Sequence, residues 1–392
     1  SRGRFTISGR TLRNVVGSLA ALLGSAVPAV AQLPAPAVVG SGPFQLGGYA
    51  AVTFSRPEHP EQVERPEVSE LVAAVLGWGQ IVPRLSYLVE LDMAKRTTET
   101  WTGREADHRL VPVRLYLEYT GNDLFRVRVG RFLTPVGQWN ERHAEPLTWT
   151  PTRPLTTYRP FAKSLTGLMI AGQGALAGHD AGYAVFWSPS AHLDRGLEEE
   201  EEESFVHALG ARVAAEFHPG VTVGLSVAGV RRSRPGDGST DPEDAPGFRA
   251  LGAAHLGTGL QGDRPGAGDR ASEDLEDREE DVRTRTLMGA DVRWAHPRME
   301  LLAEGVWLPP SEEAGYEGGA FAQGAVRLTG PLWAVVRAEA FESLDASAAR
   351  LGYAGLTLRA RGRFVAKLGR QFSRRPSERI PDGWFLSLSA LF

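Results

Sequence analysis

The sequence predicts an all-β fold, a single transmembrane antiparallel β-barrel of about sixteen strands, and three observations carry this prediction. Polar and apolar residues alternate over segments of about ten residues, the length of a tilted strand that crosses a membrane. The connections between these segments alternate between long and short along the chain. The last segment, which ends on Phe392, alternates in the same way.

Strands are expected wherever this alternation occurs. In one example, Arg126 and Arg128 alternate with Val127 and Val129. A strand with one apolar and one polar face is only half hydrophobic, which suits an overall hydrophobic content of 42%. The 45 glycines and 26 prolines argue against a helix-rich chain. The expected strands are residues 45–54, 70–78, 84–93, 112–120, 125–131, 164–172, 182–188, 205–217, 221–232, 284–295, 298–307, 319–329, 332–341, 351–360, 363–372 and 383–392.

The connections indicate which kind of β-structure these strands form. The short connections carry the Gly, Pro, Asn or Asp that hairpin turns favour, and are expected at 79–83, 121–124, 173–181, 218–220, 296–297, 330–331 and 361–362. The long, polar connections include 55–69, 94–111, 132–163, 189–204 and 233–283. Short turns on one side and long loops on the other are typical of outer-membrane barrels. Because lipid cannot satisfy backbone hydrogen bonds, we expect the sheet to close on itself.

The N-terminal residues have the pattern of a targeting segment. Four arginines and no acid occur before or at the start of an apolar stretch, Val15 to Val30, and Ala29-Val30-Ala31 matches an A-x-A cleavage site. The alternative, a transmembrane anchor, fits less well because glycine and proline interrupt a short run. We therefore expect a cleavable signal peptide at 1–31, a short periplasmic linker at 32–44 and an outer-membrane barrel at 45–392. Such a chain would be exported to the outer membrane of a double-membraned bacterium.

The C-terminal strand carries a second targeting pattern. Trp384, Leu386, Leu388 and Phe392 occupy alternate positions, so they share one face of the strand. A final phenylalanine after alternating apolar residues resembles the C-terminal assembly signal of bacterial outer-membrane barrels. The resemblance implies recognition by the barrel-assembly machinery. The alternative is a strand that happens to end the protein.

The long connection at 132–163 resembles a known family. The run V-G-R-F-L-T-P-V-G at 129–137 is similar to the G-[KR]-F-x-x-P-[FV]-G segment of phosphate-selective porin-type (O/P-like) outer-membrane proteins. Elsewhere the match is one of architecture only. The resemblance implies that this third loop folds into the barrel and narrows it, and that the protein is a homotrimer. The alternative is a loop packed on the rim. Lysine occurs only at 95, 163 and 367, so a lysine-rich phosphate funnel is not supported.

Charged residues are expected to face a water-filled lumen, because arginine on the lipid face costs about 2–4 kcal/mol at mid-membrane. Basic residues outnumber acidic ones at the positions that the alternation assigns to the lumen, which predicts a weak preference for anions. The alternative is that these charges pair with one another and only stabilise the barrel. Candidate pore-lining or constriction residues are Arg114, Arg126, Arg128, Trp139, Glu141, Arg142, Glu145, Arg337, Arg363 and Lys367.

Composition and motifs exclude several other functions. With no cysteine, the chain has no disulfide, thiolate metal site or cysteine nucleophile. The 43 basic and 47 acidic residues give a net charge of −4, which does not favour nucleic acid as a partner. The motifs G-x-S-x-G, H-E-x-x-H and the P-loop are absent. Glu141-x-His143-x-Glu145 is only a weak metal pattern, so we expect no catalytic residue, metal or cofactor.

The sequence therefore predicts a porin, a passive channel for small hydrophilic solutes or ions, with small anionic or neutral solutes and outer-membrane lipid as partners. One alternative is an outer-membrane barrel hydrolase. Another is a non-conducting barrel that binds partners through its surface loops, including the acidic run Glu198–Glu203. That run is expected either to be a solvated loop or to bind Ca²⁺ or Mg²⁺ loosely. A soluble secreted β-sandwich is the remaining alternative.

Overall fold

The computed structural model describes residues 43–57, 67–100, 103–157, 160–189, 205–232, 284–310, 316–343, 346–360, 363–374 and 382–392. The expected signal peptide (1–31), the linker up to residue 42, the acidic run Glu198–Glu203 and the connection at 233–283 lie outside these ranges. In the described part of the chain, no helix is long and apolar enough to span a membrane.

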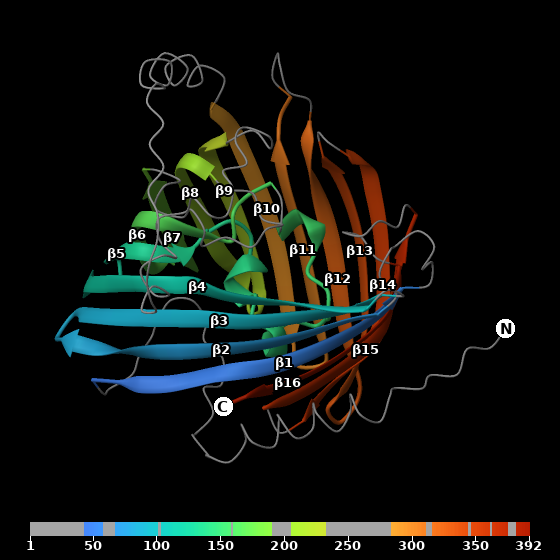
Figure 1. Cartoon of the computed structure of the whole chain (residues 1–392). Helices are drawn as coiled ribbons and strands as arrows, with labels where there is room; N and C mark the ends of the chain where they lie inside the picture. The colour runs from blue at the N-terminus through green and yellow to red at the C-terminus, as the bar shows by residue number, and fades with distance from the viewer. Residues whose placement is uncertain are drawn as a thin grey trace, which may run out of the picture.

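Sixteen antiparallel strands form one closed barrel in which each strand pairs with its neighbours in sequence and β1 pairs with β16 (Figure 1). This confirms the predicted fold class and the strand number. The strands are β1 (Gln45–Pro57), β2 (Glu67–Val82), β3 (Leu85–Thr100), β4 (Gly103–Asn122), β5 (Phe125–Leu133), β6 (Ser164–Leu176), β7 (His179–Ser188), β8 (Phe205–His218), β9 (Val221–Arg232), β10 (Thr284–His296), β11 (Met299–Leu308), β12 (Glu317–Thr329), β13 (Leu332–Ser343), β14 (Ala346–Ala360), β15 (Phe364–Ser373) and β16 (Gly383–Leu391).

The barrel closes along the seam between β1 and β16. Tyr49 lies opposite Leu391, and the backbones of Gly48 and Phe392 exchange two hydrogen bonds of 3.0 Å. On β16, Trp384 and Leu388 are exposed on the outer face, Leu386 is half-buried on the same face, and Phe392 is half-buried at the seam. The C-terminal residue is thus part of the ladder that closes the barrel.

Alternation along each strand separates an inner from an outer face, as β13 shows. Val335, Arg337 and Glu339 are buried and face the interior, whereas Val336 between them is 60% exposed on the outside. Many other large apolar side chains are exposed on the outer face. A surface this apolar is unusual in water and suits lipid.

Two groups of exposed aromatic side chains mark the edges of the apolar outer band. Close to the short turns lie Tyr119, Phe125, Phe217, Trp294 and Phe364. Close to the opposite ends of the strands lie Trp187, Tyr316, Phe372 and Trp384. Aromatic girdles at both membrane interfaces are characteristic of membrane barrels, in which they bound an apolar band about 25 Å high.

Two connections differ from the expectation. The expected loop at 94–111 is mostly strand, because β3 continues to Thr100 and β4 begins at Gly103. Polar residues such as Thr97 and Thr98 follow one another there, so the sequence shows no alternation of polar and apolar residues from which a strand could be predicted. The expected turn at 173–181 shrinks to Ala177 and Gly178, with φ of 52° and 82°. These left-handed values are those of a two-residue hairpin turn.

Candidate functional site

The connection between β5 and β6 (134–163) is called loop L3 below, and its described residues, 134–157 and 160–163, lie inside the barrel. Figure 1 shows it as green coil and short helices between the front and back strands. It contains three 3₁₀ turns: η1 (Asn140–Arg142), η2 (Glu145–Leu147) and η3 (Leu155–Thr157). Hydrogen bonds to β11, β13, β14 and β15 hold it there. The expectation that the third loop enters the lumen is confirmed.

The two ends of L3 are joined at its base. The Thr134 amide donates to the Lys163 carbonyl at 2.9 Å, and the Thr134 hydroxyl donates to the Ala162 carbonyl at 2.5 Å. The buried Asn140 amide donates to the carbonyls of Thr134 and Lys163 at 2.8 and 2.9 Å. These bonds satisfy backbone carbonyls that water does not reach, so the long loop has a fixed base.

The T-P-V-G segment forms a bend capped by β11. Gly137 has φ of +69°, and a Cβ atom there would overlap with Oε2 of Glu304. The Glu304 carboxylate, 3% exposed, accepts hydrogen bonds from the amides of Gln138 (3.0 Å) and Trp139. The Trp139 ring packs against Leu302 and Phe321. Glycine is therefore required here both by its φ and by the close approach of a carboxylate.

Basic residues of the opposite wall hold the middle of L3. Arg337 on β13 donates to the hydroxyl of Thr150 and to the carbonyl and hydroxyl of Thr152, at 2.6–2.7 Å. Arg359 on β14 donates to the carbonyls of Leu147 and Thr148 at 3.0 and 3.1 Å. Its guanidinium also lies 3.9 Å from the centre of the Trp149 ring.

Lys367 on β15 makes the most enclosed of these contacts. Its side chain is 0% exposed, and its ammonium group donates to the carbonyl (2.6 Å) and carboxylate (2.9 Å) of Glu145 and to the Thr148 hydroxyl (2.7 Å). Ser387 on β16 also donates to the Glu145 carboxylate at 2.7 Å. The structure thus places three predicted pore residues, Glu145, Arg337 and Lys367, at the attachment of L3 to the wall.

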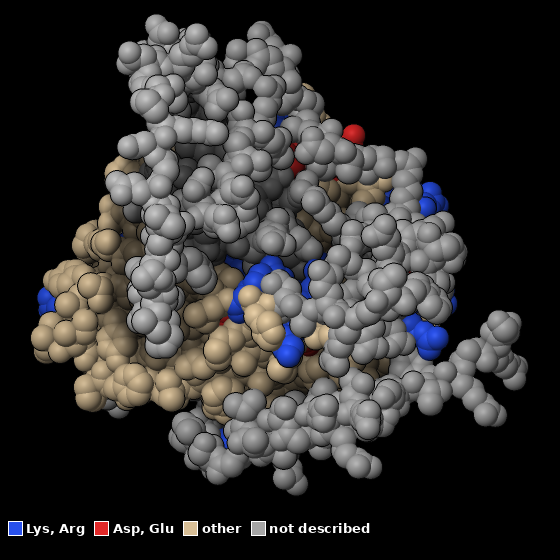
Figure 2. Space-filling view, viewed as in Figure 1, with Lys and Arg blue, Asp and Glu red and all other residues tan. Residues whose placement is uncertain are grey.

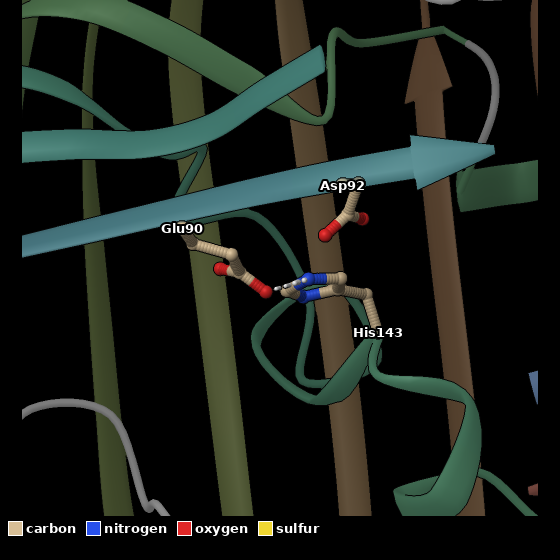
Figure 3. A group of neighbouring side chains, drawn as sticks. All are labelled: Glu90, Asp92 and His143. Carbon is tan, nitrogen blue, oxygen red and sulfur yellow. Dashed lines mark hydrogen bonds and ion pairs between the residues drawn. The ribbon is translucent and has the colours of Figure 1, made fainter. Parts of the chain in front are cut away.

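L3 is also attached to β3, where His143 lies close to Glu90 and Asp92 (Figure 3). Nε2 of His143 lies 3.3 Å from Oε1 of Glu90, and one potential ligand atom from each of the three residues lies within 4.8 Å of the others. Arg114 pairs with Glu90, and Lys163 lies 3.9 Å from Asp92, so both carboxylates already face cations. The group therefore joins L3 to β3 through polar and charged contacts.

Burial governs the charge of His143. Desolvation lowers the pKa of its imidazole to about 4, and the cations Lys163 and Arg114 act in the same direction. Glu90 opposes this shift but does not outweigh it. The imidazole is therefore neutral at pH 7. The weak metal pattern Glu141-x-His143-x-Glu145 does not form a cluster, because Glu145 lies at Lys367 and His143 lies at Glu90.

L3 leaves a cavity of about 660 Å³ between itself and the wall from β3 to β10. In Figure 2, blue lysine and arginine atoms gather near the middle of the view, in the hollow of the barrel. Five of the predicted site residues line this cavity: Arg114, Arg126, Arg128, Glu141 and Arg142. Its charged lining consists of the arginines 114, 126, 128, 142, 212 and 293 and the acids Asp123, Glu141, Asp180 and Glu216.

Most of these arginines have local acidic partners. Arg128 donates to Glu118 at 2.6 and 3.0 Å, and Arg212 donates to Asp291 at 2.5 and 3.0 Å. Arg293 donates to Glu300 at 3.0 Å. The pairing that the sequence left as an alternative is thus present along the wall.

Two charged residues of η1 project from L3 toward the cavity. The Arg142 side chain is 42% exposed and lies 3.8 Å from Glu300. Burial and the nearby Arg293 lower the pKa of Arg142, whereas burial and Asp291 raise the pKa of Glu141.

The remaining predicted residues lie elsewhere. Arg363 is half-buried in the short turn before β15, and Trp139, within L3, is buried against Leu302 and Phe321. Glu304, which caps L3, is not among the site residues predicted from the sequence. No local signal could have found it, because Glu304 and Trp139 are 165 residues apart in the chain.

Comparisons with solved structures identify the fold. OmpF of Salmonella typhi, in a complex with daunomycin, aligns at a TM-score of 0.55 and 11% identity over 89% of this chain and 97% of its own. A loop L8 deletion mutant of OmpT, an outer membrane protein of Vibrio cholerae, aligns at 0.51 and 9% over 90% and 100%. A mutant of Rhodopseudomonas blastica porin aligns at 0.46 and 11% over 89% and 100%.

No protein-family model matches this chain, and no curated protein sequence matches it either. At such low identity the structural likeness shows the fold alone. The class that fold and site define is a closed sixteen-stranded antiparallel barrel with a loop folded into its lumen, similar in fold to outer-membrane porins. The narrower resemblance of residues 129–137 to phosphate-selective porins stays a prediction.

Proposed function

We propose that this chain is a porin of the outer membrane, a passive channel for small hydrophilic solutes or ions. The observation that carries the proposal is the charged cavity between L3 and the wall from β3 to β10, inside a barrel with an apolar outer surface. Passage along a water-filled path needs no covalent step, cofactor or metal. Pore radius and fixed charge then decide which solutes pass.

A weak preference for anions is part of this proposal. The cavity lining has six arginines and four acids, a small positive excess. Because Arg128, Arg212 and Arg293 are paired with acids, their charges act mainly locally. Arg142 is the more exposed group and sits on the loop that narrows the path, so we assign it the main part of the selectivity.

Single-channel recording of the purified protein in a planar bilayer tests the proposal. We expect discrete conductance steps and, in a salt gradient, a reversal potential that favours anions. Arg142→Glu should shift the reversal potential toward cations with little change in conductance, because a charge inversion leaves the barrel intact. Arg298→Glu, in the short turn between β10 and β11, is the control and should shift it less. Absence of conductance would contradict the channel.

Export, assembly and oligomeric state belong to the same proposal. We infer that residues 1–31 direct export, and that Trp384, Leu386, Leu388 and Phe392 present β16 to the barrel-assembly machinery. We also propose a homotrimer and membership in the phosphate-selective O/P-like group. Outer-membrane fractionation and native mass spectrometry test localisation and subunit number. Ester or peptide hydrolysis by the folded barrel would instead support an enzyme, and the fold likeness does not favour that alternative.

A further inference from the structure

The outer face of β10 to β14 carries a groove lined by small side chains. Two neighbouring rows of paired residues cross these five strands: Ala290, Gly305, Ala320, Ala340 and Arg350 in one, and Val292, Ala303, Ala322, Ala338 and Gly352 in the other. The groove has a volume of about 850 Å³. The groove forms because its floor carries alanine and glycine. Bulky residues such as Leu301 and Val336 cover the outer face beside it.

One end of the groove is basic. Arg350 is exposed on the outer face of β14, opposite Ala340, and lines the groove. The exposed Arg374 lies on the neighbouring strand end, where its amide donates to the Arg350 carbonyl at 3.3 Å. In the described ranges of the chain, neither arginine has a side-chain hydrogen bond or ion pair. Among the described residues, neither guanidinium is paired with an acid, although Glu342 is exposed on the same outer face of β13. Arg350 thus places a positive charge at one end of the apolar groove.

The basic end lies at the level of a membrane interface. Arg350 lies ten residues before Ala360, the end of β14 that leads into a short turn. Ala290 lies only six residues before His296, the end of β10 that leads into a short turn. The row of small residues therefore runs from the edge of the outer band toward its middle. The edge is further marked by Trp384, which lies opposite both Arg56 and Arg370. Tryptophan and arginine are typical of the headgroup level.

We propose that this groove binds a lipid with an anionic, phosphate-bearing headgroup, whose acyl chain lies over the small residues and whose phosphate meets Arg350 and Arg374. Across five strands the row is about 19 Å long, which is comparable to the hydrocarbon thickness of one leaflet, about 15 Å. Arginine binds phosphate oxygens in a bidentate way. A phosphate headgroup matches the positive charge at this end of the groove. The proposal does not depend on conductance.

Native mass spectrometry of the delipidated protein in detergent, titrated with phosphatidylglycerol or phosphatidylcholine, tests it. We expect preferential retention of phosphatidylglycerol, reduced about fivefold for each arginine removed in Arg350→Gln and Arg374→Gln. Ala322→Phe should also reduce retention, because it fills the groove without changing charge. The matched controls are Arg298→Gln, an exposed arginine at the short-turn end, and Ala211→Phe on the outer face of β8. Both should retain lipid as the unaltered protein does.

Equal retention of the two lipids, or equal losses in the variants and their controls, would overturn the proposal. An excess of inorganic phosphate should not displace the lipid; displacement by phosphate alone would indicate a free-phosphate site instead. Heat-modifiable migration on gels reports whether each variant forms a barrel. If the variant that carries both Arg350→Gln and Arg374→Gln does not form a barrel, the single variant Arg350→Gln provides the comparison. Conductance should be the same in all these variants, so loss of lipid and loss of channel function are separable.

Discussion

Charged side chains of the inner wall hold L3 by direct hydrogen bonds. Arg337, Arg359 and Lys367 donate to its carbonyl and hydroxyl groups, and Glu304 accepts from its amides. The sequence could assign these residues to the inner face, because alternation fixes the direction of each side chain. It could not assign their partners, since every contact joins residues far apart in the chain.

Removing the cap of L3 should loosen the bend at Gly137. Glu304→Ala leaves the buried amides of Gln138 and Trp139 without an acceptor, at a cost of about 1–3 kcal/mol for each. We expect faster amide hydrogen exchange at 137–142 and noisier open-channel current. Glu304→Gln keeps one acceptor oxygen and should show a smaller effect. Equal exchange in the alanine variant and the unaltered protein would contradict the capping role.

Acid should weaken the attachment of L3 at His143. In the detached loop the imidazole has its ordinary pKa near 6.5, whereas burial lowers its pKa to about 4 when attached. Protons therefore favour the detached loop. The contribution of His143 is complete above pH 6.5 and falls by about 3 kcal/mol as the pH drops to 4. Hydrogen exchange of L3 measured across this window should accelerate.

The groups that face His143 are Glu90, Asp92, Arg114 and Lys163. His143→Gln removes the titrating imidazole and leaves these groups in place. The acceleration between pH 6.5 and 4 should then largely disappear. If the same acceleration persists in this variant, another group is responsible.

At the scale of elements, strands were predictable and loop contacts were not. The alternation placed β9 at its observed bounds and most other strands within a few residues, because the boundary between lipid and lumen imposes a period of two. It missed the far ends of β3 and β4, where polar residues lie on both faces. The entry of L3 into the barrel was implied by a resemblance, whereas its attachments depend on β11, β13, β14 and β15.

The bend of L3 provides a test with a matched control. Gly137 and Gly178 both have left-handed φ, of +69° and +82°, but only at Gly137 would a Cβ atom meet a neighbour, Glu304. Gly137→Ala should therefore cost more than Gly178→Ala, which carries the backbone cost of about 1–2 kcal/mol alone. Denaturant unfolding and open-channel noise measure the two variants. Equal effects would show that the approach of Glu304 is unimportant.

At the scale of the whole molecule, the apolar outer surface is predicted to be the surface in contact with lipid. Val336→Arg places a charge near the middle of the outer band and should destabilise the folded barrel in a bilayer by about 2–4 kcal/mol. Leu328→Arg, close to a short turn, should cost about 0–1 kcal/mol because the interface is wet. Reversible unfolding in vesicles measures both. Equal costs would contradict the assigned depth of these residues.

The seam between β1 and β16 affects how the barrel folds. Tyr49 pairs with Leu391, so the ladder that completes the ring joins residues more than 300 positions apart. The entropy of closing so long a loop rises only with the logarithm of its length, yet pairings of this separation form slowly. Until they form, β1 and β16 each present an unpaired edge to which another chain could add. Before the ring closes, the protein is therefore an open sheet whose two edges can pair with other chains.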